Sequence, residues 1–183
     1  MKIQFDSALQ YQKDAIHSIV DIFQGQEICD SNFTVYSPEF LASQQNFQFS
    51  EIGFGNRLTI TEGQILQNVQ QIQLKNGLKP SSKAEVDRNA LDFTIEMETG
   101  TGKTYVYLRT ILEMYRRYGF AKHIIVVPSI PIKEGVYKSL EITREHLREL
   151  YDNVNYNFFV YDSGKLNEVR DFATNDSLEI MVI

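Results

Sequence analysis

The sequence predicts an α/β fold in which helices cover both faces of a parallel sheet. Three observations lead to this prediction. Strand and helix patterns alternate from residue 91 onward. The segment Ile124–Val127 is apolar at every position, as expected for a strand that is buried on both faces. A glycine-bearing turn at residues 97–104 joins an apolar run to a helical pattern, which is how parallel strands and covering helices are commonly connected.

The alternating region begins with the strand that leads into this turn. Apolar runs predict its strands, and apolar residues at helical spacing predict its helices. Predicted strands cover 92–97, 122–127, 156–161 and 178–183, and predicted helices cover 103–117 and 131–150. We therefore assign residues 91–183 to the α/β domain.

The chain before residue 91 predicts a leading helix and an inserted region. Residues 7–24 have apolar side chains at helical spacing, and Ser7 and Gln10 are spaced as a capping box. Residues 26–90 are rich in Gln and Asn, with a short strand expected at 58–60. A helix there begins with a second capping box, Thr61 and Gln64, and ends at Asn76-Gly77. The expected organisation is a leading helix at 1–25, an α+β insertion at 26–90 and the domain at 91–183.

Residues 99–104, Thr-Gly-Thr-Gly-Lys-Thr, have the composition of a phosphate-binding loop. Gly100 and Gly102 lack Cβ atoms, so the backbone N–H groups can turn toward an oxyanion. The helix that follows offers unpaired N–H groups and the positive end of its dipole. Lys103 would reach the β- and γ-phosphates, and the Thr104 hydroxyl would ligate Mg²⁺.

A second candidate site follows the strand at 122–127. Ser129 and Lys133 lie where this strand gives way to a helix, so a hydroxyl, backbone N–H groups and a cation could hold a nucleic-acid phosphate. The alternative is an ordinary strand–helix connection in which Pro131 starts the helix. Tyr11-Gln12, near the start of the first helix, is a third candidate, because an amide can pair with the N6/N7 edge of adenine.

Composition limits the class of protein. The 183 residues are 43% hydrophobic and 23% charged, which is typical of soluble globular proteins, and no apolar run approaches the length of a membrane span. The single cysteine, Cys29, fits a reducing cytoplasm. The net charge is −6, yet residues 101–150 hold nine Lys/Arg against five Asp/Glu. This local positive charge could meet a polyanion. The alternative, which we favour for most of them, is that these cations face solvent on two helices: Arg109, Arg116, Arg117, Lys138, Arg144 and Arg148.

These motifs together resemble those of superfamily 2 helicases and translocases, and more closely the Res subunit of type III restriction enzymes. Residues 11–16 resemble the adenine-reading Q motif, and residues 95–104, with their Glu-Met-Glu lead, are similar to motif I of that subfamily. Residues 126–136 are similar to motif Ia, and residues 161–166 also resemble a stretch of that family. The resemblance covers most of the chain.

The resemblance implies a RecA-like P-loop NTPase domain in which ATP hydrolysis drives switching or movement on double-stranded DNA. A separate nuclease domain would cut the DNA, and a modification methyltransferase (Mod) subunit would read its sequence, with S-adenosylmethionine in the full complex. By residue, Lys103 would hold phosphates, Thr104 would hold Mg²⁺ and Gln12 would read adenine. The backbone of Thr99, Gly100, Thr101 and Gly102 would cradle phosphate, and Ser129 and Lys133 would touch the DNA backbone.

Two departures from the family pattern shape the expectation. The chain has no Asp-Glu dipeptide to hold Mg²⁺ and orient water, and it stops on an apolar run at 178–183. We therefore expect a fragment, truncated at its C-terminus, that binds ATP weakly and hydrolyses it negligibly. The alternatives are the motor subunit of a type I restriction enzyme or another helicase, a small P-loop kinase, and a nucleotide-gated binding module without enzymatic activity.

Overall fold

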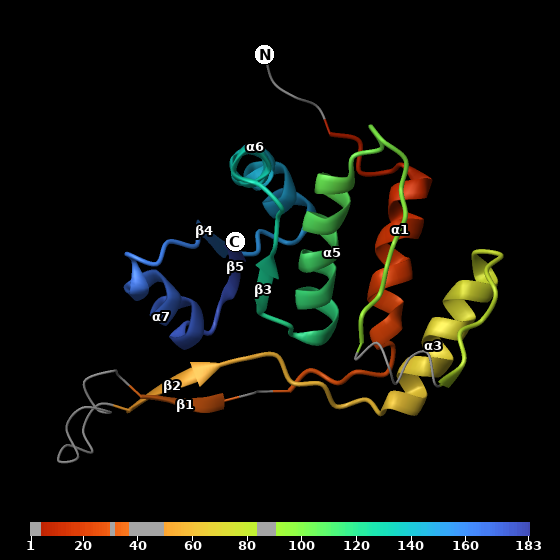
Figure 1. Ribbon diagram of the computed structural model, residues 1–183, viewed down its shortest axis with the longest axis horizontal. Helices are drawn as coiled ribbons and strands as arrows, with labels where there is room; N and C mark the ends of the chain where they lie inside the picture. The colour runs from red at the N-terminus through yellow and green to blue at the C-terminus, as the bar shows by residue number, and fades with distance from the viewer. Residues whose placement is uncertain (1–4, 30–31, 37–49, 84–90) are drawn as a thin grey trace. The chain divides into compact units, whose positions relative to one another are not determined.

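A computed structural model describes residues 5–29, 32–36, 50–83 and 91–183 (Figure 1). The chain divides into two compact units. The helical unit comprises the described residues of Met1–Ile28 and Leu58–Tyr118, and the sheet unit those of Cys29–Arg57 and Gly119–Ile183. The boundaries of these two units differ from the boundaries of the expected organisation into 1–25, 26–90 and 91–183. That organisation stays a prediction.

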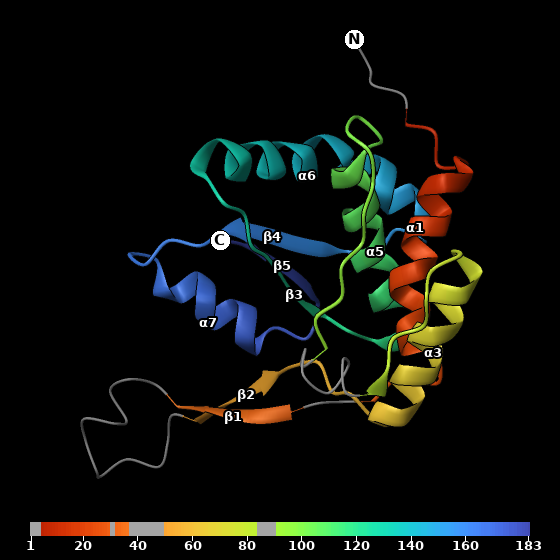
Figure 2. The same ribbon diagram turned by 45° about the vertical axis from the view of Figure 1, so that its right-hand side comes forward.

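The helical unit is built from three α-helices: α1 (Gln10–Val20), α3 (Glu62–Lys75) and α5 (Lys103–Tyr118). Helix α1 continues into a short 3-10 helix, Asp21–Phe23, and lies between α3 and α5 in both views (Figures 1 and 2). Helix α1 packs on α5, and both bury large apolar side chains. The most deeply buried are Ile16 and Val20 of α1 and Leu108 and Leu112 of α5.

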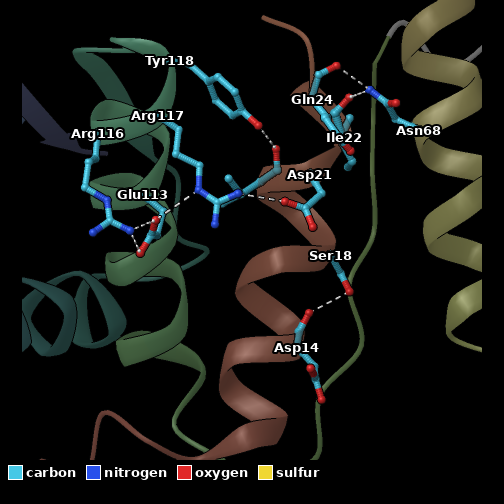
Figure 3. A network of polar contacts seen from close by, with 11 residues as sticks. Asp14, Ser18, Asp21, Ile22, Gln24, Asn68, Glu113, Arg116, Arg117 and Tyr118 are labelled. Atoms are coloured by element: carbon cyan, nitrogen blue, oxygen red, sulfur yellow. Dashed lines mark hydrogen bonds and ion pairs between the residues drawn. The ribbon is translucent and has the colours of Figure 1, made fainter.

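A small apolar cluster joins α3 to the turn after α1. Ile22, Ile60, Ile65 and Val69 are buried in it, and Phe93 packs against its side. The Asn68 side-chain amide donates to the carbonyls of Ile22 and Gln24, at 2.9 Å each (Figure 3). This polar contact fixes the chain direction where α1 ends.

The two expected capping boxes have different outcomes. Thr61 and Gln64 form one, with the Gln64 N–H donating to Thr61 Oγ1 and the Thr61 N–H donating to Gln64 Oε1. The expected box at Ser7 and Gln10 is wrong: α1 begins at Gln10, and its N-cap, Leu9, makes no side-chain cap. Asp6 instead accepts from the Ala8 N–H at 2.8 Å, and this local turn replaces the first helical turn.

The sheet unit holds three parallel strands, β3 (Lys122–Ile125), β4 (Tyr156–Val160) and β5 (Leu178–Val182), in the order β3-β5-β4. Helices α6 (Ile130–Leu150) and α7 (Leu166–Thr174) connect them. The two connections cross the sheet in opposite directions. Right-handed crossovers therefore place α6 and α7 on opposite faces, as Figure 2 shows. The predicted parallel sheet with helices on both faces is confirmed. The expectation that Ile124–Val127 is buried on both faces is wrong, since Ile124 is 52% and Val126 76% exposed.

Strand β5 is the centre of this sheet, and every residue of it is buried. The ladder continues past the assigned strands, where the Val127 N–H donates to the Ile183 carbonyl at 3.0 Å. An antiparallel hairpin of β1 (Asn32–Tyr36) and β2 (Ser50–Phe54) precedes the sheet in sequence and contacts α7 through β2. The Asn56 side chain, just after β2, hydrogen-bonds both the N–H and the carbonyl of Lys122.

Two strand predictions are wrong. Residues 92–97 form no strand, since no described residue pairs with their backbone and Ile95 is exposed. Residues 58–60 form none either. Their Thr59 N–H donates instead to the Gln26 side chain, and Ile60 enters the apolar cluster. None of the helices in the described part of the chain combines the length and apolar character that a membrane crossing requires.

Candidate phosphate-binding site

The loop at residues 99–104 has the backbone geometry that its glycines predict. Gly100 has φ +81° and Gly102 has φ +84°, in the left-handed region that residues with a Cβ rarely adopt. Between them, the Thr101 hydroxyl donates to the Glu98 carbonyl at 2.7 Å. The Val106 N–H donates to the Gly102 carbonyl at 3.0 Å. The loop thus turns tightly and runs directly into α5.

The start of α5 is suited to bind an anion. Lys103 is the first residue of the helix and is exposed, and Thr104 follows it half-buried. In an α-helix the first N–H groups have no partner within the helix, and the dipole makes this end positive. The first turn of α5 contains no acidic residue that would compete for these groups. A loop of this kind, with an ammonium and a hydroxyl beside it, can hold a polyphosphate and its metal ion.

Gln12 of α1 lies against this loop. The side chain is only 5% exposed, and its Nε2 donates to the Thr101 carbonyl at 2.9 Å. A Cβ added at Gly102 would stand 2.8 Å from Nε2, so the end of the Gln12 side chain would have to shift. The other amide atom, Oε1, is buried without a hydrogen-bond partner in the described structure. A buried carbonyl oxygen without a partner is energetically unfavourable, and a ligand could donate to it only if the groups around Gln12 moved aside.

A groove of about 1170 Å³ opens beside the loop within the helical unit. Helices α1 and α3 and residues 91–101 line it, and Thr99, Gly100 and Thr101 form part of one wall. Lys103 and Thr104 are not among its lining residues. Four carboxylates line the groove and would repel phosphate: Asp14, Asp92, Glu96 and Glu98. A phosphate would therefore be repelled from the groove and attracted to the Lys103 end of the loop.

Ser129 and Lys133 lie in the sheet unit, at the start of α6. Ser129 is the N-cap of α6, is exposed, and makes no side-chain cap. Its carbonyl accepts from the Lys133 N–H at 3.0 Å, so both residues belong to the first turn. Pro131 stands at the start of the helix, as expected, and the first turn holds no acidic residue. The structure thus joins these two residues, while their contact with DNA stays a prediction.

Metal binding by protein side chains alone is not supported in the described residues, where no three His, Cys, Asp or Glu side chains gather closely enough to hold an ion. The Thr104 hydroxyl, at the start of α5, is one oxygen that could ligate an ion beside the loop. That donor fits a Mg²⁺ ion that takes most of its other ligands from phosphate and water.

Arg109 is the residue that sequence reasoning missed. It is one of the six cations for most of which a solvent-facing position is expected, but it is only 7% exposed. Its Nη1 donates to the Ser7 carbonyl at 3.0 Å, and its guanidinium lies 5.6 Å from the centre of the Tyr105 ring. The helical spacing of Tyr105, Leu108, Arg109 and Leu112, all buried, is the signal that places it on the inner face of α5.

The family model for the type III restriction enzyme, res subunit, matches residues 7–182. The chain belongs to this family. It is similar to the EcoPI Res subunit of Escherichia phage P1, with 30% identity over 154 residues, 81% of this chain. It is also similar to the EcoP15I Res subunit of Escherichia coli, with 37% identity over 97 residues, 51% of this chain. The StyLTI Res subunit of Salmonella typhimurium is 34% identical over 119 residues, 57% of this chain.

Family membership confirms the resemblance that motifs at 11–16, 95–104 and 126–136 indicated. Together with the parallel sheet and its helices, it also confirms the fold class, a RecA-like P-loop domain. The chain spans only 14%, 10% and 12% of the lengths of the EcoPI, EcoP15I and StyLTI subunits.

Proposed function

We propose that this chain is the ATP-binding part of an ATP-dependent DNA motor in a type III restriction enzyme. The observation that carries the proposal is the loop at 99–104. Its two glycines have left-handed backbone and lie just before the start of α5, where Lys103 is the first residue and is exposed. The chain also belongs to the Res family. Membership of that family favours this motor over a type I motor and over a small kinase.

Each residue of the site has a distinct role in this proposal. Lys103 neutralises the β- and γ-phosphates, and the backbone N–H groups of Thr99 to Gly102 surround their oxygens. Thr104 contributes its hydroxyl to Mg²⁺, and the ion, when bound, offsets the charge that develops on the phosphates. The chain would hold the triphosphate at the N-terminal end of α5, where the helix dipole is positive.

Gln12 gives the site a preference for adenine. One hydrogen of its Nε2 is donated to the Thr101 carbonyl, and its buried Oε1 has no partner among the described residues, so Oε1 would accept from adenine once the groups around it make way. Adenine presents an amino group at its six position, which can donate to Oε1, whereas guanine presents a carbonyl oxygen there. A guanine would leave two acceptors facing each other, and the site would reject it.

The DNA-binding part of the proposal rests on the first turn of α6. Ser129 and Lys133 contact a phosphate of double-stranded DNA through the hydroxyl, the ammonium and the free N–H groups of that turn. In the complete cytoplasmic enzyme, a Mod subunit reads the DNA sequence, with S-adenosylmethionine in the complex, and a nuclease domain cuts. Because the chain has no Asp-Glu pair, the 183 residues alone bind ATP weakly and turn it over negligibly.

The test is ATP turnover, with DNA present, by the full-length protein that contains this chain and by its Lys103→Ala variant. Loss of the ammonium should lower turnover about 100-fold or more, by analogy with the removal of a single charge-stabilising donor. Lys75→Ala is the matched control, because Lys75 is another exposed lysine of the helical unit, at the end of α3. Turnover that survives Lys103→Ala at the level of the control would refute the proposed function.

A further inference from the structure

Helices α1 and α5 run parallel and are joined by polar contacts at both ends. At the loop end, Gln12 meets Thr101; at the other end, the Tyr118 hydroxyl donates to the Val20 carbonyl at 3.0 Å (Figure 3). Each end also carries an arginine of α5 that reaches the α1 side. These are Arg109 at the loop end and Arg117 at the far end.

Arg109 holds the chain just before it enters α1. Besides its hydrogen bond to the Ser7 carbonyl, its guanidinium lies over the Tyr105 ring, and that ring stacks on Phe5 with centroids 5.6 Å apart and planes inclined by 12°. Phe5 and Ser7 are therefore both attached to the first two turns of α5. The same turns begin at Lys103. The residues that lead into α1 and the loop at 99–104 are thus both attached to the first two turns of α5.

Arg117 makes a contact of a different kind. Its Nη1 lies 3.0 Å from the Asp21 carboxylate and its Nε 3.4 Å from Glu113, while Arg116 pairs with the same Glu113 at 2.8 Å (Figure 3). The Arg117 and Asp21 side chains are 35% and 37% exposed. This network lies about 20 Å along α5 from Lys103, at a helical rise of ~1.5 Å per residue. It acts on residues after α1, far from Gln12.

We propose that Arg109 is a positioning residue of the nucleotide site, acting through Gln12; this inference rests on the proposed function. By fixing the entry to α1, Arg109 sets the position and rotation of that helix, and so holds the Gln12 amide against Thr101. A hydrogen bond of 2.9 Å is lost if the two groups separate by about 1 Å. Arg109 does not itself contact the nucleotide.

The chemistry of arginine suits this role. A guanidinium is planar, so it can stack on an aromatic ring while its edge donates to a carbonyl, which an ammonium cannot do with the same geometry. Arg109 donates to Ser7 while its guanidinium carbon lies 5.6 Å from the centre of the Tyr105 ring. Its burial adds rigidity, because a buried side chain has few alternative rotamers.

The experiment uses the full-length protein, with ATP·Mg²⁺ and GTP·Mg²⁺ as substrates. The variants are Arg109→Met, Gln12→Ala and the double variant, with Arg117→Met as the matched control. Arg109→Met should raise KM for ATP about 2- to 10-fold, the equivalent of one hydrogen bond, with little change in kcat. It should lower the preference for ATP over GTP by a similar factor. Arg117→Met should leave both quantities unchanged.

The double variant separates positioning from general destabilisation. If Arg109 acts through Gln12, the double variant has the same KM as Gln12→Ala, because one contact cannot be lost twice. The inference would be overturned if the KM increases of the two single variants multiplied in the double variant. It would also be overturned if Arg109→Met left KM unchanged. Should Arg109→Met fail to fold, Arg109→Lys replaces it. Arg109→Lys keeps the positive charge but should still raise KM for ATP. An unchanged KM in Arg109→Lys would likewise overturn the inference.

The failure of this inference is distinct from the failure of the proposed function. If ATP turnover is lost in Lys103→Ala but its KM is unchanged in Arg109→Met, only the role of Arg109 is refuted. Turnover that is indifferent to Lys103 would remove the site itself.

Discussion

Residues 92–97 and strand β5 are both short segments rich in apolar side chains, but only β5 is a strand. Strand β5 is hydrogen-bonded on both sides, to β3 and to β4, and each of its residues is buried. Residues 92–97 have no backbone partner in the described structure, and most of their side chains are exposed. The comparison shows that an apolar sequence alone does not make a strand. The segment must also hydrogen-bond through its backbone to neighbouring strands.

The loop after residues 92–97 nevertheless has its expected form. Gly100 and Gly102 adopt left-handed backbone, and the Thr101 hydroxyl closes the turn on Glu98. These causes are local in sequence, so they do not require the preceding segment to join a sheet. The backbone geometry of residues 99–104 is therefore specified by the loop itself and by the start of α5.

The largest effect should distinguish β5 from residues 92–97. Leu178 is fully buried, and Leu178→Ala should cost about 2–5 kcal/mol of unfolding free energy, through lost burial and the cavity left behind. Ile95 is 41% exposed, and Ile95→Ala should cost less than about 1 kcal/mol. Urea denaturation of the 183-residue chain, followed by circular dichroism, measures both. Equal costs would mean that residues 92–97 are packed as tightly as β5.

The two loop glycines should differ from each other. Each has positive φ, so replacement by alanine should cost about 1–2 kcal/mol at either position. A Cβ at Gly100 meets nothing within 4 Å, while one at Gly102 comes within 2.8 Å of Gln12. Gly102→Ala should therefore cost about 1 kcal/mol more, because Gln12 must give up its bond to Thr101.

Thermal or urea unfolding of both variants tests this difference. The Gln12→Ala change, added to each glycine variant, should close the gap between them, because it removes the clash at Gly102 only. A gap of the same size in both backgrounds would show that Gln12 is not its cause.

The capping residues offer a smaller contrast. Thr61→Ala removes a formed capping box and should cost about 1 kcal/mol. The side chain of Ser7 caps no helix, so Ser7→Ala should change the unfolding free energy by less than about 0.5 kcal/mol. The urea midpoint of each variant, at unchanged denaturant slope, gives the measurement. An effect of Ser7→Ala as large as that of Thr61→Ala would be contrary to the structure.

The smallest effect concerns pH and the sheet unit. Burial lowers the pKa of His123, whose ring nitrogen bonds the Phe120 carbonyl at 2.8 Å. The unfolded histidine, with a pKa near 6.5, then binds protons more readily than the folded one, so stability should fall as pH drops below about 6.5. His123→Gln should weaken this fall in denaturation curves recorded between about pH 5 and 7. An identical pH dependence in the variant would exclude His123 as its source.

Sequence predicted those features whose causes lie close together along the chain. The strands β3, β4 and β5, the helices α5 and α6, the Thr61 cap and the two loop glycines all follow from periodicity or turn chemistry. The hairpin of β1 and β2 was not specified, because residues 37–49 separate its strands and no short turn signal marks it. Helix α7 is short, and its pattern was too brief to identify.

The features that escaped prediction depend on contacts between distant residues. Arg109 is buried because Ser7 and Phe5, far away in sequence, come to lie against α5. Gln12 was singled out by its motif, but its bond to Thr101 and its unpartnered Oε1 are visible only in the folded chain. The predicted strand at 92–97 is wrong for the same reason, because a strand needs a neighbouring segment to hydrogen-bond with, and the local sequence does not specify that segment.

The most direct measurement is isothermal titration of ATP·Mg²⁺ into the full-length protein and into its Lys103→Ala variant. We expect saturable binding by the wild type and binding at least about tenfold weaker in the variant, because a charge-assisted contact to phosphate is lost. Wild-type protein that takes up no ATP, or a Lys103→Ala variant that binds it equally well, would contradict the assignment of residues 99–104 as the phosphate-binding loop.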